Sequence, residues 1–144
     1  MPGILEFMAS EHEKCDEQFA AAEQQVSKKQ WEQADAGFDA FHTAMERHFK
    51  MEEDVLFVHL ERVMGGGVGP VAVMKMEHGQ MRDLMGELAA RLKARDTDGY
   101  LGAAETLLVL MQQHNMKEEQ ILYPMAERAL ASGQEQIVGE MENV

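Results

Sequence analysis

The segments HFKMEEDVLF (residues 48–57) and HNMKEEQILY (residues 114–123) share a pattern that decides the predicted fold of this chain. Each begins with histidine, carries Glu-Glu at its fifth and sixth positions, and ends with a β-branched residue, leucine and an aromatic residue. The two segments are 66 residues apart, and Glu11-His12 precedes Glu77-His78 by the same interval. A long unit present twice indicates a duplicated pair of helices rather than a solenoid of short repeats.

Three pairs of potential metal ligands repeat at this interval. They are His12 with His78, His48 with His114, and Glu52 with Glu118. Each copy therefore reads H…H-x-x-x-E. One such pair is expected by chance, but three pairs in register predict a shared function.

Composition limits the class of protein. A chain of 144 residues with 45% apolar content fits one globular domain, and we expect residues 1–131 to form it, with residues 132–144 as a tail or short helix. No apolar run is long enough for a membrane helix, and the N-terminus lacks the features of a secretory signal. A single cysteine, Cys15, excludes an internal disulfide and favours a reducing compartment, the cytoplasm.

The net charge of −13 argues against nucleic acid and against an anionic membrane surface as partners, because both would repel an acidic protein. Acidity fits a cation-binding protein, although it names no partner. No nucleophile–base motif, phosphate-binding loop or nucleotide fingerprint is present, so no catalytic residue is predicted.

Helical periodicity is strong, and strand patterns are almost absent. Apolar residues and the six candidate ligands recur at steps of three and four, which predicts an all-α protein, an up-down-up-down antiparallel four-helix bundle built from two similar helical hairpins. Glycines and Pro70 in the segment 65–70 mark the central break, Asp96 to Gly99 mark another, and Pro124 predicts a bend or a freed carbonyl. The predicted helices cover residues 4–28, 31–64, 69–95 and 98–131.

The spacing predicts that the four histidines lie at one level of the bundle. His12 and His48 are each about 18 residues from the turn near position 30, or roughly 27 Å along a helix at ~1.5 Å per residue. His78 and His114 are likewise symmetric about the next turn. Residues four apart share a helix face, so the two glutamates lie one turn from their histidines in the same core.

Four imidazoles and two carboxylates in one core require a cation, because unpaired buried carboxylates are destabilising. Structural zinc sites are usually rich in thiolate, and calcium and magnesium prefer oxygen ligands alone, whereas imidazole with carboxylate suits iron. If each of two metals takes two histidines and both share the glutamates, a bridging oxide or hydroxide leaves one position open. An open position admits a small diatomic molecule, peroxide or water.

The other polar residues allow less specific interpretations. We expect His42 to be exposed, and His59 to be a neighbour of the ligands, a residue on an access path or a polar residue at the bundle end. Glu53 and Glu119 fit solvated or cap-like positions, or hydrogen bonds to ligand histidines, and Glu11 and Glu77 fit surface charges. Cys15 fits a buried apolar role, with a redox role as the minor alternative, while four methionines are expected to wall the site: Met45, Met74, Met81 and Met111.

With Glu11-His12, His48-x-x-x-Glu52, Glu77-His78 and His114-x-x-x-Glu118, residues 4–131 resemble the hemerythrin-like, or HHE cation-binding, domain family. The resemblance implies a four-helix bundle around two iron ions bridged by oxide or hydroxide. Members include oxygen carriers, oxygen or redox sensors, nitric-oxide-responsive proteins and iron–sulfur repair proteins.

This chain departs from the oxygen carriers. They have a further histidine where this chain has Met74, and a His-x-x-x-x-Asp pattern where it has His114-x-x-x-Glu118. The four-histidine, two-glutamate set is closer to the centre of the iron–sulfur repair type.

Three functions remain open. The chain can be a di-iron protein that binds or responds to O2, NO or peroxide, in oxidative or nitrosative stress or in iron–sulfur repair. It can be an iron-sensing or iron-storage module without turnover, or a structural bundle with a vestigial site. The sequence does not identify a protein redox partner.

Overall fold

The computed structural model describes residues 2–65 and 69–144, and the prediction of an all-α protein is confirmed over these residues, which contain no strand. Residues 66–68, part of the predicted central break, lie outside the described residues. None of the described helices combines the length and apolar character needed to cross a membrane.

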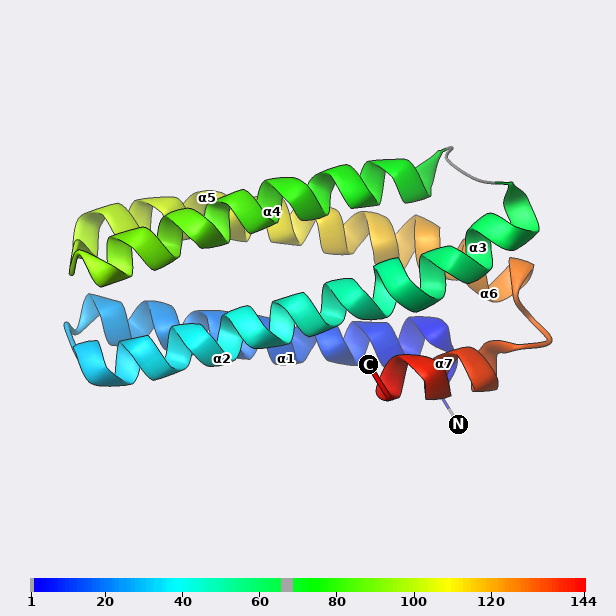
Figure 1. Cartoon of the computed structure of the whole chain (residues 1–144), viewed down its shortest axis with the longest axis horizontal. Helices are drawn as coiled ribbons and strands as arrows, with labels where there is room; N and C mark the ends of the chain where they lie inside the picture. The colour runs from blue at the N-terminus through cyan, green and yellow to red at the C-terminus, as the bar shows by residue number, and fades with distance from the viewer. Residues whose placement is uncertain (1, 66–68) are drawn as a thin grey trace.

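Four long helical segments form two hairpins (Figure 1). Helix α1 (Ile4–Ser27) packs along α2 (Trp31–Lys50), and α4 (Pro70–Lys93) packs along α5 (Thr97–Lys117). The starts of these four helices agree with the sequence prediction to within a few residues. The predicted ends at 64 and 131 are approached only when α2 and α5 are taken together with the helical segments that continue them to Met64 and Ala129. Consecutive long helices run in opposite directions, and the two hairpins lie side by side.

Two π-helical segments interrupt helices that were predicted to be regular. Segment η1 (Met51–Leu56) joins α2 to α3 (Phe57–Met64), and η2 (Glu118–Leu122) joins α5 to α6 (Tyr123–Ala129). Pro124 follows η2, in agreement with the predicted distortion, but Val58 holds the equivalent position after η1. Proline is therefore not required for the π turn, and both turns coincide with the repeated Glu-Glu motif.

Local signals explain several helix ends. The Asp96 side chain accepts a hydrogen bond from the Gly99 backbone N–H at 2.9 Å and caps α5, as predicted. Gly65 ends α3 with a φ of +83°, a left-handed conformation that favours glycine. Pro70 occupies the first turn of α4, where a missing N–H breaks no helical hydrogen bond.

A short helix, α7 (Gln134–Glu142), packs on α1 and η1 near the N-terminus (Figure 1). Its residues Ile137, Val138 and Met141 are buried in the same apolar core as Ile4 and other residues of the bundle end. The segment after residue 131 thus packs against η1, the element that carries Glu52.

Two apolar cores lie along the bundle on either side of a polar layer. One contains Phe19, Phe41 and Leu88, and the other contains Met8 and Leu56. The polar layer is where the repeated histidines and glutamates lie. Apolar packing on both sides therefore holds these polar groups away from water.

Candidate metal centre

The structure brings all six repeated histidines and glutamates together. They come from α1, α2, η1, α4, α5 and η2, and each is no more than 4% exposed: His12, His48, Glu52, His78, His114 and Glu118. Their donor atoms form two overlapping groups in which all atoms lie within 4.8 Å of one another. One group is Glu52, His78, His114 and Glu118, and the other is His12, His48 and Glu118.

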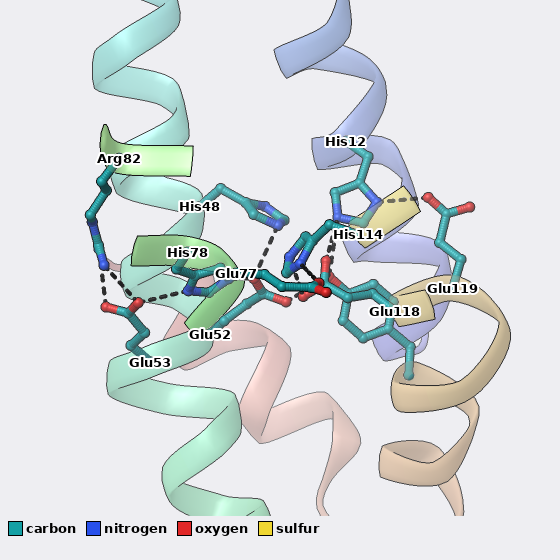
Figure 2. A network of polar contacts seen from close by, with 11 residues as sticks. His12, His48, Glu52, Glu53, Glu77, His78, Arg82, His114, Glu118 and Glu119 are labelled. Carbon is teal, nitrogen blue, oxygen red and sulfur yellow. Dashed lines mark hydrogen bonds and ion pairs between the residues drawn. The ribbon is translucent and has the colours of Figure 1, made fainter. Parts of the chain in front are cut away.

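Contacts between the hairpins repeat across the layer (Figure 2). His78 Nε2 lies 3.0 Å from Glu52 Oε1, and His12 Nε2 lies 3.0 Å from Glu118 Oε1. Each histidine therefore faces the glutamate of the opposite hairpin, which joins the two hairpins at this level.

Contacts within each helix are less complete. His48 Nε2 lies 3.5 Å from Glu52 Oε1, and His114 Nε2 lies 3.1 Å from Glu118 Oε2, one turn along the chain as predicted. Neither of these two pairs has hydrogen-bond geometry. Four buried atoms of the cluster have no hydrogen-bond partner among the described residues: Nδ1 and Nε2 of His48, Nε2 of His114 and Oε2 of Glu118. Buried polar atoms are rarely left unpaired in this way.

Outer carboxylates hold two of the imidazole rings. His78 Nδ1 donates to Glu53 Oε2 at 2.6 Å, and His12 Nδ1 donates to Glu119 Oε2 at 2.6 Å. Of the roles that the sequence left open for Glu53 and Glu119, the structure shows the hydrogen bond to a repeated histidine. The guanidinium of Arg82 in turn donates to both carboxylate oxygens of Glu53, at 2.9 and 3.1 Å.

The prediction that Glu77 is a surface charge was wrong. Glu77 is 5% exposed and accepts a hydrogen bond from His114 Nδ1 at 2.8 Å, while Lys117 Nζ donates to its other oxygen. Its counterpart in the first repeat, Glu11, is partly exposed and pairs with Lys14 at 3.5 Å. The sequence has a glutamate before the histidine in both repeats, Glu11-His12 and Glu77-His78, and so did not indicate that only Glu77 would be buried.

Tyr123 is a site residue that the sequence analysis did not assign. Its buried hydroxyl lies 2.8 Å from Glu52 Oε2, 2.9 Å from Glu118 Oε1 and 3.2 Å from His12 Nε2. It follows Glu118 by five residues, and a regular α-helix would place residues five apart on different faces. The π turn η2, with its i→i+5 hydrogen bonds, aligns them. The equivalent turn η1 precedes Phe57, whose ring stacks on His78 at 5.9 Å between ring centroids.

Burial and charge shift the pKa values of the cluster in opposite directions. Burial lowers the pKa of His48 to about 3. Burial also disfavours the charged form of His114, but contact with Glu118 and the charge of Glu52 outweigh it and raise the pKa to about 9. Burial and the charge of Glu118 raise the pKa of Glu52. Glu52 and Glu118 are buried side by side, so both can be ionised only if nearby positive charge stabilises them.

The family model described as the Hemerythrin HHE cation binding domain matches residues 3–126. The chain belongs to this family. No curated protein and no solved structure gave a significant match. The resemblance that the repeated histidines and glutamates predicted is confirmed.

A hemerythrin HHE domain binds metal cations, and the residues of this chain fit such a group. Three of the four histidines donate Nδ1–H to an outer carboxylate, and His12 and His78 direct Nε2 toward the central glutamates. Metal-binding histidines are usually held in this way, with one nitrogen hydrogen-bonded and the other free for the ion. The unpaired atoms of His48, His114 and Glu118 are the acceptors that a cation would satisfy.

The remaining predicted residues lie around the layer. His42 is exposed, as expected, and His59 lies toward the bundle end, with Nε2 3.1 Å from Glu140 Oε1 of α7. Cys15 is buried, which agrees with the apolar role. The four methionines expected to wall the site are buried within about one turn of a repeated histidine: Met45, Met74, Met81 and Met111.

Proposed function

We propose that the buried cluster holds two iron ions bridged by oxide or hydroxide. His78 and His114 would hold one ion, His12 and His48 the other, and Glu52 and Glu118 would lie between them. We further interpret the alternating helix directions in Figure 1 as an up-down-up-down four-helix bundle of two similar hairpins, an architecture that can build a metal site in its core from facing helices.

The donor set supports iron. It contains four imidazoles and two carboxylates but no thiolate, which disfavours a structural zinc site. Calcium and magnesium prefer oxygen donors alone. A mixed nitrogen and oxygen set inside a helical bundle is typical of carboxylate-rich di-iron proteins.

We propose that the protein binds or responds to a small oxidant, O2, NO or peroxide, in oxidative or nitrosative stress or in iron–sulfur repair. Bound iron would supply redox chemistry and an open position for a small ligand. The chain itself excludes water through the two apolar cores and orients the imidazoles through Glu53, Glu77 and Glu119. The Tyr123 hydroxyl offers the glutamates a proton donor within 3 Å.

One observation carries the proposal. His48 is fully surrounded by protein, yet neither of its ring nitrogens has a hydrogen-bond partner, and it shares a dry layer with two buried carboxylates. Burying an unpaired polar group is unfavourable, so an imidazole in that position lowers the stability of the fold unless a further group binds it.

Elemental analysis and optical spectra of the purified protein test this proposal. We expect two irons per chain and an oxo-to-iron absorption band near the ultraviolet edge. In the variant His48→Ala the band should be lost and the iron content should fall. His42→Ala is the matched control, because His42 is exposed and outside the cluster. Unchanged iron content in His48→Ala would contradict the proposed site.

Anaerobic addition of NO to the ferrous protein tests the oxidant-binding step. A new visible spectrum is expected, and an unchanged spectrum in iron-loaded protein would contradict it. That result would favour the alternative, an iron-sensing or iron-storage module without turnover. The buried carboxylates also support this alternative. They destabilise the fold when no metal is bound, so iron binding would raise the free energy of unfolding.

The single buried cysteine supports a reducing compartment, and we propose a cytoplasmic location. The partner that we propose is the small oxidant, and no protein redox partner is assigned. Cell fractionation tests the location, and recovery from an oxidising compartment would contradict it.

A further inference from the structure

The internal repeat makes the two halves of the cluster directly comparable, and they are not equivalent. The half that contains His78 and His114 gathers four donor groups within 4.8 Å, together with Glu52 and Glu118. The half that contains His12 and His48 gathers three within that distance, with Glu118, while Glu52 Oε1 lies 3.5 Å from His48 Nε2. We name these the four-donor half-site and the three-donor half-site.

The outer contacts differ in the same direction. In the four-donor half-site both Nδ1 atoms are held, His78 by Glu53 and His114 by Glu77. In the three-donor half-site Glu119 holds His12, but His48 Nδ1 has no partner. One histidine of the three-donor half-site therefore lacks the contact that orients a metal ligand.

The outer carboxylates are also fixed to different degrees. Arg82 holds Glu53 and Lys117 holds Glu77, whose side chain is 7% exposed. Glu119 has a side chain that is 38% exposed, and among the described residues its polar contact is with His12. An exposed carboxylate without a cation is free to turn toward water, so it orients His12 less firmly.

The three-donor half-site also lies closer to solvent. A surface cavity of about 370 Å³ lies between α1 and the junction of α5 with η2. It is lined by His12, Glu119 and the exposed carboxylates of Glu13 and Asp16. Such carboxylates raise the local concentration of cations. The cavity therefore gives cations a route to His12.

Two effects oppose each other here. The carboxylates around the cavity attract a cation, but each exposed charge changes binding only about twofold to fivefold. Loss of a contact that orients a ligand typically changes metal affinity about 10–100-fold. The missing Nδ1 contact of His48 therefore outweighs the surface charge at equilibrium.

We propose that the two half-sites bind transition-metal cations unequally. The first ion occupies the four-donor half-site, and the second, weaker ion occupies the three-donor half-site and exchanges through the cavity beside His12. This inference rests on the proposed two-metal site and assigns each half of it a different affinity.

Cobalt(II) titration of the metal-free protein under anaerobic conditions tests the proposal by calorimetry and visible absorption. Two phases are expected, with dissociation constants at least about tenfold apart. Anomalous diffraction from crystals grown with one equivalent of cobalt(II) should place the ion beside His78 and His114. An ion beside His12 and His48, or equal occupancy of both, would overturn the proposal.

The variant pair Glu77→Ala and Glu11→Ala provides matched changes at equivalent positions of the repeat. Glu77→Ala should weaken the first phase about 10–100-fold, because it removes the partner of His114 Nδ1. Glu11→Ala should change neither phase more than about twofold, because Glu11 pairs with Lys14 on the surface. Equal effects of the two variants would contradict the assignment.

Circular dichroism of both variants checks that they fold, and the diffraction result on the unaltered chain does not depend on either variant. The outcomes also separate this inference from the proposed function. Absence of any cobalt or iron binding would contradict the metal site itself, whereas two ions of equal affinity would contradict only the inequality.

Discussion

His12 and His78 make the same pair of contacts at positions 66 residues apart. Each Nε2 lies 3.0 Å from a central glutamate, Glu118 for His12 and Glu52 for His78. Each Nδ1 lies 2.6 Å from the next glutamate along the chain, Glu119 for His12 and Glu53 for His78. The duplication visible in the sequence therefore persists in the geometry of the site. Departures from this symmetry are correspondingly informative, because each equivalent position serves as an internal control.

Removal of metal should lower thermal stability. A cation that binds only the folded chain at 100 times its dissociation constant adds about 2.7 kcal/mol. For a chain of this size that corresponds to a melting temperature higher by about 5–10 °C. Differential scanning fluorimetry with and without a chelator measures the change. Equal melting temperatures in metal-loaded and chelated protein would contradict the role of the cluster as a cation site.

Tyr123→Phe should destabilise the metal-free protein by about 1–3 kcal/mol, because it removes the hydroxyl that faces Glu52 and Glu118. The ring itself is tolerated, since Phe57 occupies the equivalent position. Urea denaturation of the metal-free and metal-loaded variant measures the effect, which should be smaller with metal bound. A loss that is equal in both states would show that the hydroxyl acts independently of the cluster.

Arg82→Ala should destabilise the protein by about 1 kcal/mol or more. Arg82 donates to Glu53 and Glu46, and its guanidinium lies 4.9 Å from the Phe49 ring centroid. Lys75→Ala is the control, because Lys75 pairs with Glu61 at an exposed position where such pairs contribute about 0–1 kcal/mol. Comparable losses in the two variants, measured by chemical denaturation, would argue against a special role for Arg82.

The pH dependence follows from His114, whose folded pKa of about 9 lies above its ordinary value of 6.5. A raised pKa means that His114 stabilises the metal-free fold fully below about pH 6.5, and this contribution is lost as the pH rises through about 9. Metal binding requires the neutral imidazole, so the advantage of the metal-loaded form should grow across the same interval.

Melting temperatures of the metal-free and cobalt-loaded protein between pH 6.5 and 9 measure this effect. The difference between the two forms should increase with pH in the unaltered chain and increase less in His114→Gln, which does not titrate. A difference that falls with pH would contradict the sign derived from His114.

Periodicity and the internal repeat were sufficient to predict the helical fold and the six residues that meet in its core. They act through short-range geometry, because residues three or four apart share a helix face and equal distances from a turn bring two helices to one level. The same reasoning placed Cys15 in the core and His42 on the surface.

Only the tertiary structure revealed the π turns, the inward position of Tyr123 and the burial of Glu77. Regular helical periodicity assigns residue 123 to another face, and nothing local distinguishes Glu77 from Glu11. Which glutamate turns inward depends on partners distant in sequence, His114 and Lys117 for Glu77. Equivalent sequence positions therefore share a place in the fold, while their charge environment is decided by what packs against them.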